Sequence, residues 1–429
     1  MNDISLISLV LLPLIYAVLR RQKLSPDDFL LNGRRTGLMA TISSTICGNI
    51  GIGTFVAIFL FSSASPAIGY SVVGAYGLGL LVCGAFAGRV HALAKRHNAF
   101  GLVDLIVATH GVKNKYLIWL PVAAVFLMRT VVQLIALATV LAGALHIPFA
   151  AALFCGGGVV AAYTMLGGYK FATETDIFQA LIIVGGIAVL GFCLPVDSRA
   201  EPDFFDFSAY GLPMLIGIWL FLPFSPLLAI DNWQRIATAA DPAISRRGFF
   251  IAALVCSAAY FVIAEAGRRL GGEDVVGALR GVMPTALADV MLVAAIMSSI
   301  DTFIMPLVTT IAASRGMGFI RLSVAGLFGA SCLIALFVGS LLDSVVAAFN
   351  ALTVFLPVAF GALFLRAPPP VAASATMLSG FILAFAFSFL SPQIASFIGF
   401  LFSASLYLGL SLWSRRRVAR QPLEDQRRR

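Results

Sequence analysis

Charged residues are scarce in this sequence: 11% of its 429 residues are Asp, Glu, Lys or Arg, whereas 60% are hydrophobic. Water-soluble domains carry about 25% charged residues. A soluble globule of this length cannot hide so much apolar surface, so the low charge excludes that class. Apolar stretches of roughly 20 residues recur along the sequence, each long enough to cross a hydrocarbon core about 30 Å thick. The composition predicts an all-α polytopic membrane protein.

Cysteine and histidine are also rare, with six and four residues. The cysteines fall inside apolar stretches and show no paired spacing, and the histidines lie in loops or at the ends of these stretches. This pattern argues against a disulfide framework and against a zinc site. No motif for nucleophilic or metal catalysis is present either, so we do not expect an enzyme.

The apolar stretches predict about thirteen membrane spans. They lie near residues 4–20, 37–61, 66–88, 116–142, 147–167, 175–195, 210–230, 248–267, 286–313, 322–342, 345–365, 371–390 and 393–413.

The basic residues predict the orientation of these spans. With the N-terminus outside, all but five of the 29 Lys and Arg residues fall in the connections on the inner side or in the tail. The exceptions are Arg129, Arg199, Arg268, Arg269 and Arg280. Basic residues accumulate on the cytoplasmic side of membrane proteins. We therefore expect a plasma-membrane protein, bacterial inner membrane favoured, with a cytoplasmic C-terminus. This asymmetry accounts for the net charge of +9 without a nucleic-acid partner.

Two of the predicted spans are interrupted by residues that disfavour a continuous helix. The second contains STICGNIGIG, residues 44–53, and the seventh contains GIWLFLPFSPLLAI, residues 217–230, with Pro223, Ser225 and Pro226. Interrupted helices at matching positions of two inverted halves mark the midplane site of a transporter. The alternative is that the glycines permit close helix packing and that the prolines only kink the helix.

The spacing of these two spans predicts a domain organisation. Without the first span, they begin two consecutive groups of five. We expect one extra N-terminal helix, two inverted repeats of five spans, two extra C-terminal helices and a basic tail. The boundaries are 1–35, 36–196, 197–366, 367–414 and 415–429.

Four motifs resemble the sodium/solute symporter family. They are GNIGIGTFV at 48–56, YTMLGGYKFATETDIFQ at 163–179, DNWQRIATAADPAISRRG at 231–248 and LVAAIMSSIDTFI at 292–304. Thr302 stands where the family usually has serine in the last motif. The resemblance extends over the whole chain and implies the LeuT-type inverted-repeat fold. It also implies a secondary active transporter that couples sodium to a small organic solute.

The resemblance implies a sodium site between the second and ninth spans. Its ligands would be the carbonyl groups of Cys47, Ile50 and Ala295 and the hydroxyl groups of Ser298 and Ser299. Neutral oxygens suit a hard, singly charged cation. The interruption at 44–53 is then explained, because an unwound helix presents its carbonyls to an ion. The alternative for the two serines is a hydrogen bond to a carbonyl one turn earlier.

Three charged residues lie within or at the predicted spans, where such residues are usually functional. By resemblance, Asp176 would receive sodium on its way to the cytoplasm; pairing with Lys170 is the alternative. Asp301 would support the site through hydrogen bonds. Arg129, with Gln133 one turn later, would hold a carboxylate of the solute. The alternative for Arg129 is an ion pair with an acid such as Asp301.

The rest of the solute pocket is expected to be mostly aromatic. With Arg129 and Gln133, it would be lined by Asn49, Thr54, Phe55, Tyr76, Trp219, Phe221 and Phe224. A small carboxylate-bearing solute and a functional monomer are the preferred expectations. Two alternatives stay open: a symporter-like solute sensor that signals to a partner, and a proton-coupled symporter of the same fold.

Overall fold

The computed structural model describes residues 3–20, 23–196, 204–338, 341–365 and 368–427, and this part of the chain is helical apart from one isolated bridge between Thr36 and Ala239. The first helices are α1 (Asp3–Leu19), α2 (Pro26–Leu31), η1 (Asn32–Arg34), α3 (Leu38–Asn49), α4 (Ile52–Ala64), α5 (Pro66–His97), α6 (Leu102–His110), α7 (Tyr116–Leu145) and α8 (Phe149–Cys193). Next come α9 (Gly211–Phe221), η2 (Leu222–Phe224), α10 (Ser225–Leu228), α11 (Ile230–Thr238), α12 (Pro242–Leu270), α13 (Val275–Val282) and α14 (Thr285–Ala312). The last are α15 (Met317–Ala335), α16 (Leu341–Leu352), η3 (Thr353–Phe355), α17 (Leu356–Phe364), α18 (Pro370–Leu390) and α19 (Pro392–Arg427).

The predicted number of spans is not confirmed. Within the described residues, ten helices are long and apolar enough to cross a membrane, or eleven if the bent pair α3–α4 forms one span. Two of the predicted spans account for the difference. Residues 4–20 form α1, whose apolar part is short, and 147–167 and 175–195 are joined in the 45-residue α8. Gly168 has φ +58° and ψ −152°, so α8 contains two helical segments that meet at this residue.

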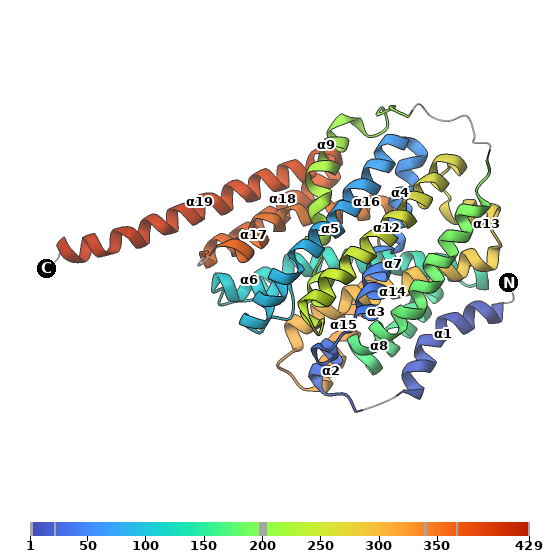
Figure 1. Ribbon diagram of the computed structural model, residues 1–429, viewed down its shortest axis with the longest axis horizontal. Coiled ribbons are helices and arrows are strands. Elements are labelled where there is room, and N and C mark those ends of the chain that lie inside the picture. Colours follow the sequence, from blue (N-terminus) through green and yellow to red (C-terminus); the bar gives the residue numbers. More distant parts are fainter. Residues whose placement is uncertain (1–2, 21–22, 197–203, 339–340, 366–367, 428–429) are drawn as a thin grey trace.

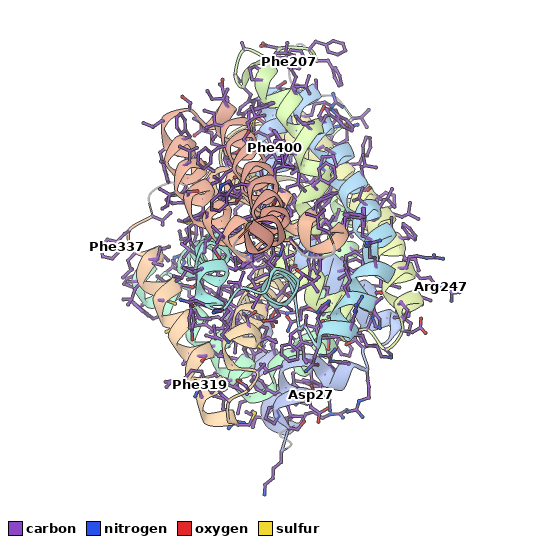
Figure 2. All side chains as sticks on the ribbon, turned by 90° about the vertical axis from the view of Figure 1, so that its left-hand side faces the viewer. Asp27, Phe207, Arg247, Phe319, Phe337 and Phe400 are labelled. Atoms are coloured by element: carbon purple, nitrogen blue, oxygen red, sulfur yellow. The ribbon has the colours of Figure 1, made fainter. Side chains whose placement is uncertain are left out.

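Helix α14 lies at the centre of the bundle, surrounded by other helices. In the most apolar part of α14, 94% of the residues are buried, because α7, α8 and α15 pack against this helix. A second group, α3, α4 and α5, packs on α12. Figure 1 shows these helices in the body of the molecule, while the C-terminal part of α19 projects beyond it. Apolar side chains cover much of the outside, as Phe319 and Phe337 illustrate in Figure 2.

The first predicted interruption is present between α3 and α4. The two helices are bent by 53° at this point. Ile50 leaves helical geometry with ψ 52°, and Gly51 is extended with ψ 165°. A side chain on Gly51 has no room, since an added Cβ would lie 2.6 Å from the Ser299 Oγ atom. Glycine at this position therefore allows α14 to approach the break.

The second predicted interruption lies later in the sequence than expected. Pro223 sits in the 3-10 turn η2 and Pro226 in the first turn of α10, and the backbone stays in the right-handed helical region through Ser225. The residue that leaves helical geometry is Ala229, with φ −73° and ψ 118°. Proline is tolerated in the first turn of a helix because no intrahelical bond needs its nitrogen. The two prolines therefore start short helical segments, and the break follows them.

Candidate sodium and solute site

Four of the five predicted sodium ligands meet at the break between α3 and α4. The Ser299 hydroxyl lies 3.1 Å from the Cys47 carbonyl oxygen and 2.9 Å from the Ala295 carbonyl oxygen. The Ser298 hydroxyl lies 3.2 Å from the same Ala295 oxygen. Both serines are completely buried. The alternative, bonding back along the helix, is thus observed for both, but Ser299 also reaches across to α3.

The spacing of these oxygens is compatible with a small cation. Two hydroxyl protons serve three close oxygen pairs, so one contact lacks a hydrogen bond of its own. Around a sodium ion with ligands at about 2.4 Å, neighbouring oxygens of an octahedral shell lie about 3.4 Å apart. The observed distances need to lengthen by only a few tenths of an ångström to reach this value. Ile50, the fifth predicted ligand, is buried and forms the bend itself.

Two further groups hold the broken backbone. The Ile52 amide donates to the Oε1 atom of Gln133 on α7, at 3.2 Å. The Tyr260 hydroxyl on α12 donates to the Asn49 carbonyl, at 2.7 Å. Backbone groups freed inside a membrane need partners within the protein. The break is therefore held by side chains from three other helices, α7, α12 and α14.

A buried arginine from α11 lies against the other side of the break. Arg235 donates through Nη1 to the Asp231 carboxylate at 2.6 Å and to the Asn232 side-chain oxygen at 2.8 Å. Its Nη2 atom would lie 1.9 Å from a Cβ added at Gly48, so this glycine makes room for the guanidinium. In the sequence, Arg235 is one residue of the motif at 231–248 and has no predicted role of its own. Its contact with α3 depends on tertiary packing and was not predicted.

Arg129 lies on the wall of a small cavity beside the break. Its guanidinium stacks on Phe303 at 4.3 Å and on Phe349 at 5.8 Å from the ring centroids. The cavity is also lined by Gln133, as predicted for this pair. Within the described residues no carboxylate lies within ion-pair distance of Arg129, and Asp301 is not its partner. The ion pair that was the alternative for Arg129 is therefore not observed.

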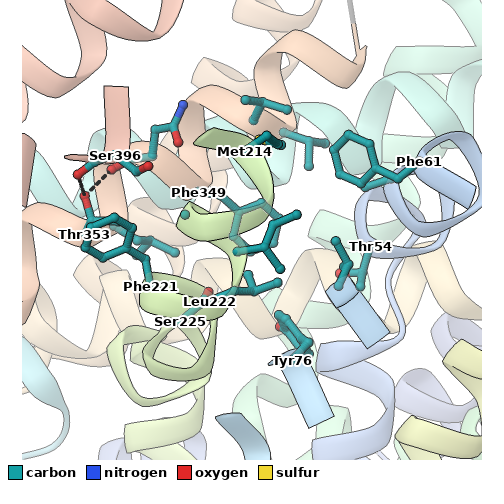
Figure 3. A pocket seen from close by; sticks show the side chains of 18 of the residues that line it. Thr54, Phe61, Tyr76, Met214, Phe221, Leu222, Ser225, Phe349, Thr353 and Ser396 are labelled. Atoms are coloured by element: carbon teal, nitrogen blue, oxygen red, sulfur yellow. Dashed lines mark hydrogen bonds between the residues drawn. The ribbon is translucent and has the colours of Figure 1, made fainter. Parts of the chain in front are cut away.

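A second, larger cavity of about 90 Å³ adjoins the first, and both are lined by Thr54 and Phe349. Figure 3 shows Thr54, Tyr76 and Phe221 facing its interior, with Phe349 between them. Tyr76 also donates to the Asn49 side chain at 3.0 Å. The predicted residues Thr54, Tyr76, Arg129, Gln133 and Phe221 are thus brought together around adjoining cavities.

The remaining predicted pocket residues do not line these cavities. Trp219 is 49% exposed on the outside of α9, and Phe224 lines a separate outer groove. Phe55 is buried, and Asn49 acts through its bond to Tyr76. Successive residues of one helix point in different directions. Because α9 remains helical as far as Phe221, Trp219 falls on its other face.

The two predicted carboxylates are deeply buried. Asp176 is 1% exposed, and neither of its carboxylate oxygens has a hydrogen-bond partner in the described structure. Its backbone carbonyl accepts a long contact from the Cys47 thiol at 3.4 Å, which places Asp176 beside the predicted sodium ligands. Pairing with Lys170 is not observed among the described residues. Asp301 has one oxygen, Oδ1, without a partner.

Sequence reasoning missed the contribution of α16 to the site. Phe349 and Val345 line both cavities, and Asn350 lines the larger one. These residues lie in an apolar stretch with no distinguishing motif. Only the packing of α16 against α4 and α7 brings them to the site.

Comparison with known proteins shows a resemblance to one transporter family. Residues 29–196 match the model of the Sodium:solute symporter family. The predicted family resemblance is confirmed. A sodium/pantothenate symporter of Haemophilus influenzae is 26% identical over 256 residues, which is 52% of this chain and 51% of the relative. That of Escherichia coli is 31% identical over 113 residues, 26% of this chain and 23% of the relative. The chain therefore matches about half or less of the length of these curated relatives.

Solved symporter structures share the fold over nearly the whole chain. One is a substrate-bound, outward-open Na+-coupled sialic acid symporter, with a TM-score of 0.72, 14% identity and coverage of 94% of each chain. Another is a nucleobase-cation-symport-1 family transporter in a closed conformation with bromovinylhydantoin bound; its TM-score is 0.62 with 14% identity, over 92% of this chain and 96% of that chain. The predicted LeuT-type fold is confirmed.

Proposed function

We propose that this protein is a secondary active transporter that couples sodium entry to uptake of a small organic solute. The observation that carries the proposal is the cluster of oxygens from Cys47, Ala295, Ser298 and Ser299 at a broken helix. The family match and the fold support it. Sodium joins α3 to α14, so it stabilises the conformation in which these helices are close together. A ligand shifts a conformational equilibrium by its difference in affinity for the two states.

We propose the membrane orientation that the basic residues predict, with the N-terminus outside and the tail in the cytoplasm of a bacterial inner membrane. The division into two inverted repeats, at 36–196 and 197–366, and the monomeric state belong to the same proposal. Asp176 would then receive the ion after it leaves the oxygen cluster. Its buried carboxylate has no hydrogen-bond partner among the described residues, and its backbone carbonyl contacts Cys47; both observations support this role.

We propose that the solute carries a carboxylate that binds Arg129. A guanidinium stacked on aromatic rings can still bind a carboxylate with two parallel hydrogen bonds. Among the described residues no acid neutralises Arg129, and the adjoining cavity is mostly apolar with Tyr76 and Thr54 at its wall. The relatives are named for pantothenate and sialic acid, which are both carboxylates. The expected solute is a carboxylate with a largely apolar body.

Uptake into proteoliposomes tests the proposal. A panel of small carboxylates is assayed with an inward sodium gradient, an inward proton gradient or neither. Uptake that requires sodium is expected; uptake with protons alone contradicts sodium coupling. Solute binding without any uptake indicates the sensor alternative.

Arg129→Gln is expected to weaken apparent solute affinity by about 10- to 100-fold, the effect of losing a charged hydrogen-bonded pair. Arg129→Lys, which keeps the charge but not the paired geometry, is expected to lie between Gln and wild type.

A further inference from the structure

A large groove lies on the outside of the bundle, separated from the larger cavity of the proposed solute site by Phe221, which lines both. It has a volume of about 490 Å³, within the range typical of small-molecule sites. Helices α9, α17 and α19 and the turn η2 contribute its walls. Its principal side chains are Phe221, Phe224, Phe360, Phe364, Phe400 and Leu408. Phe364 is 45% exposed and Leu408 59% exposed, so the groove opens at the surface of the molecule.

The groove offers almost no hydrogen-bonding groups. Among its lining residues only Tyr407 has a polar side-chain atom, and this hydroxyl lies 2.8 Å from the Nε2 atom of His110 on α6. Burial lowers the pKa of His110 to about 4, so the imidazole is neutral near pH 7. Its Nδ1 atom donates to the Ile106 carbonyl, which leaves Nε2 to accept from Tyr407. The groove therefore suits a hydrocarbon chain.

The positively charged side chain of Arg89 borders this groove at Phe364. The guanidinium of Arg89 lies 4.5 Å from the ring centroid of Phe364, and its Nε atom donates to the Leu363 carbonyl at 2.8 Å. Within the described part of the chain its two terminal amino groups have no further hydrogen-bond partner. Arg89 is exposed and lies eight residues before the end of α5, roughly 12 Å along the helix axis. Arginines near the end of a membrane helix place their charge at the headgroup level.

The surrounding sequence favours a lipid over a second copy of the chain. The last turn of α5 carries Lys95, Arg96 and His97. In Figure 1 the end of α17 and the helix α6 lie on the same side of the molecule as the outgoing α19. A second copy at this groove would bring two basic surfaces together, whereas an anionic headgroup complements them.

We propose that this groove binds one acyl chain of an anionic phospholipid, with the lipid phosphate held by Arg89. The phosphate accepts hydrogen bonds from the terminal amino groups of the guanidinium, and the acyl chain lies along the aromatic wall of α17 and α19. The bound lipid contacts Phe221, which lines both this groove and the larger cavity of the proposed solute site. The site does not depend on the proposed transport activity.

Native mass spectrometry of the full-length protein in detergent tests this site, with phosphatidylglycerol and phosphatidylcholine of identical acyl chains as probes. Wild type is expected to retain phosphatidylglycerol about fivefold more strongly, the effect of one basic residue near an anionic lipid surface. Arg89→Gln is expected to abolish this preference. Arg315→Gln is the matched control, since Arg315 is also exposed and stacks on a phenylalanine, Phe319, but lies away from the groove.

Filling the groove provides an independent test. Ala404 lines the groove on α19, and Ala404→Phe is expected to reduce binding of both lipids. Equal retention of the two lipids by wild type would overturn the proposal, as would an Arg89→Gln variant that behaves like Arg315→Gln. A dimer that Ala404→Phe dissociates, measured by light scattering, would show that a second copy occupies the groove. Arg89→Gln replaces an exposed side chain, so its result stands even if Ala404→Phe fails to fold.

Discussion

The two breaks in the helical framework differ in what holds them. At the first, between α3 and α4, the backbone contacts Gln133, Tyr260 and Ser299, which come from three other helices. At the second, before α11, the carbonyls of Pro226 and Leu227 accept hydrogen bonds from Asn232 and Trp233, six residues further along. The first break is thus assembled by tertiary structure, and its oxygens include the proposed sodium ligands. The second is closed mainly by its own sequence, since the contact that another helix adds to these carbonyls is a long one, 3.8 Å from the Cys83 thiol to the Pro226 oxygen.

The largest expected effect comes from removing space at the first break. Gly48→Ala places a methyl group against Arg235, which cannot move because Asp231, Asn232 and Ser44 hold it. Overpacking costs about 1–3 kcal/mol or more. We expect a lower thermal midpoint in detergent and a loss of most uptake.

The control for this variant is Gly143→Ala on α7, where an added Cβ meets no atom within 4 Å. Alanine is favoured over glycine in a helix by about 0.8–1.0 kcal/mol. The control is therefore expected to be unchanged or more stable. Equal destabilisation of both variants would show that Arg235 does not pack tightly at the break.

Removing one predicted sodium ligand, the Ser299 hydroxyl at the first break, is expected to have the next largest effect. Ser299→Ala deletes the hydroxyl that joins α14 to Cys47. An interaction between a polar group and a charge contributes about 1.5–3 kcal/mol to binding. Its loss is expected to raise the half-saturating sodium concentration about 10- to 100-fold. Sodium-dependent uptake measures this value. Ser323→Ala is the control, because its exposed hydroxyl bonds only to the Phe319 carbonyl one turn earlier. An unchanged sodium requirement in Ser299→Ala would remove this residue from the proposed site.

Sodium itself distinguishes the two breaks. At a sodium concentration ten times its dissociation constant, binding stabilises the closed site by about 1.4 kcal/mol relative to a locally opened state that cannot bind the ion. Amide exchange that requires this opening then slows about tenfold. We expect this protection in residues 48–53 and little change in residues 225–232. Hydrogen–deuterium exchange in sodium and in choline measures it. Equal protection of both segments would mean that the second break also responds to the ion.

The smallest expected effect on sodium-coupled uptake is at the second break. Trp233→Phe removes the indole nitrogen that donates to the Leu227 carbonyl. One neutral hydrogen bond contributes about 1 kcal/mol. The free energy of unfolding is expected to fall by at least that amount, because the smaller ring also leaves a cavity, while the sodium dependence of uptake stays the same. Trp219→Phe, on the exposed side of α9, serves as the matched control. A changed sodium dependence in Trp233→Phe would contradict the view that this break is closed locally.

Sequence reasoning was most successful where the signal is local. The glycines at 48, 51 and 53 and the serines at 298 and 299 lie in recognisable motifs, and the structure brings Cys47, Ser299 and Ala295 together. It was least successful on the seventh span. The prolines predicted a break at 223–226, but they begin short helical turns, and the chain becomes extended only at Ala229. A proline restricts its own φ, whereas its neighbours and tertiary contacts decide whether the helix continues.

The sequence by itself determined that this chain lies in a membrane and which segment of α3 cannot continue as a helix, because apolar length and glycine act locally. Tertiary structure alone decided what surrounds the break. Arg235 against Gly48, Tyr260 on the Asn49 carbonyl, and Phe349 on the Arg129 guanidinium join residues far apart in the chain. Such contacts depend on how helices pack, and no pattern within one helix specifies which partner another helix will present.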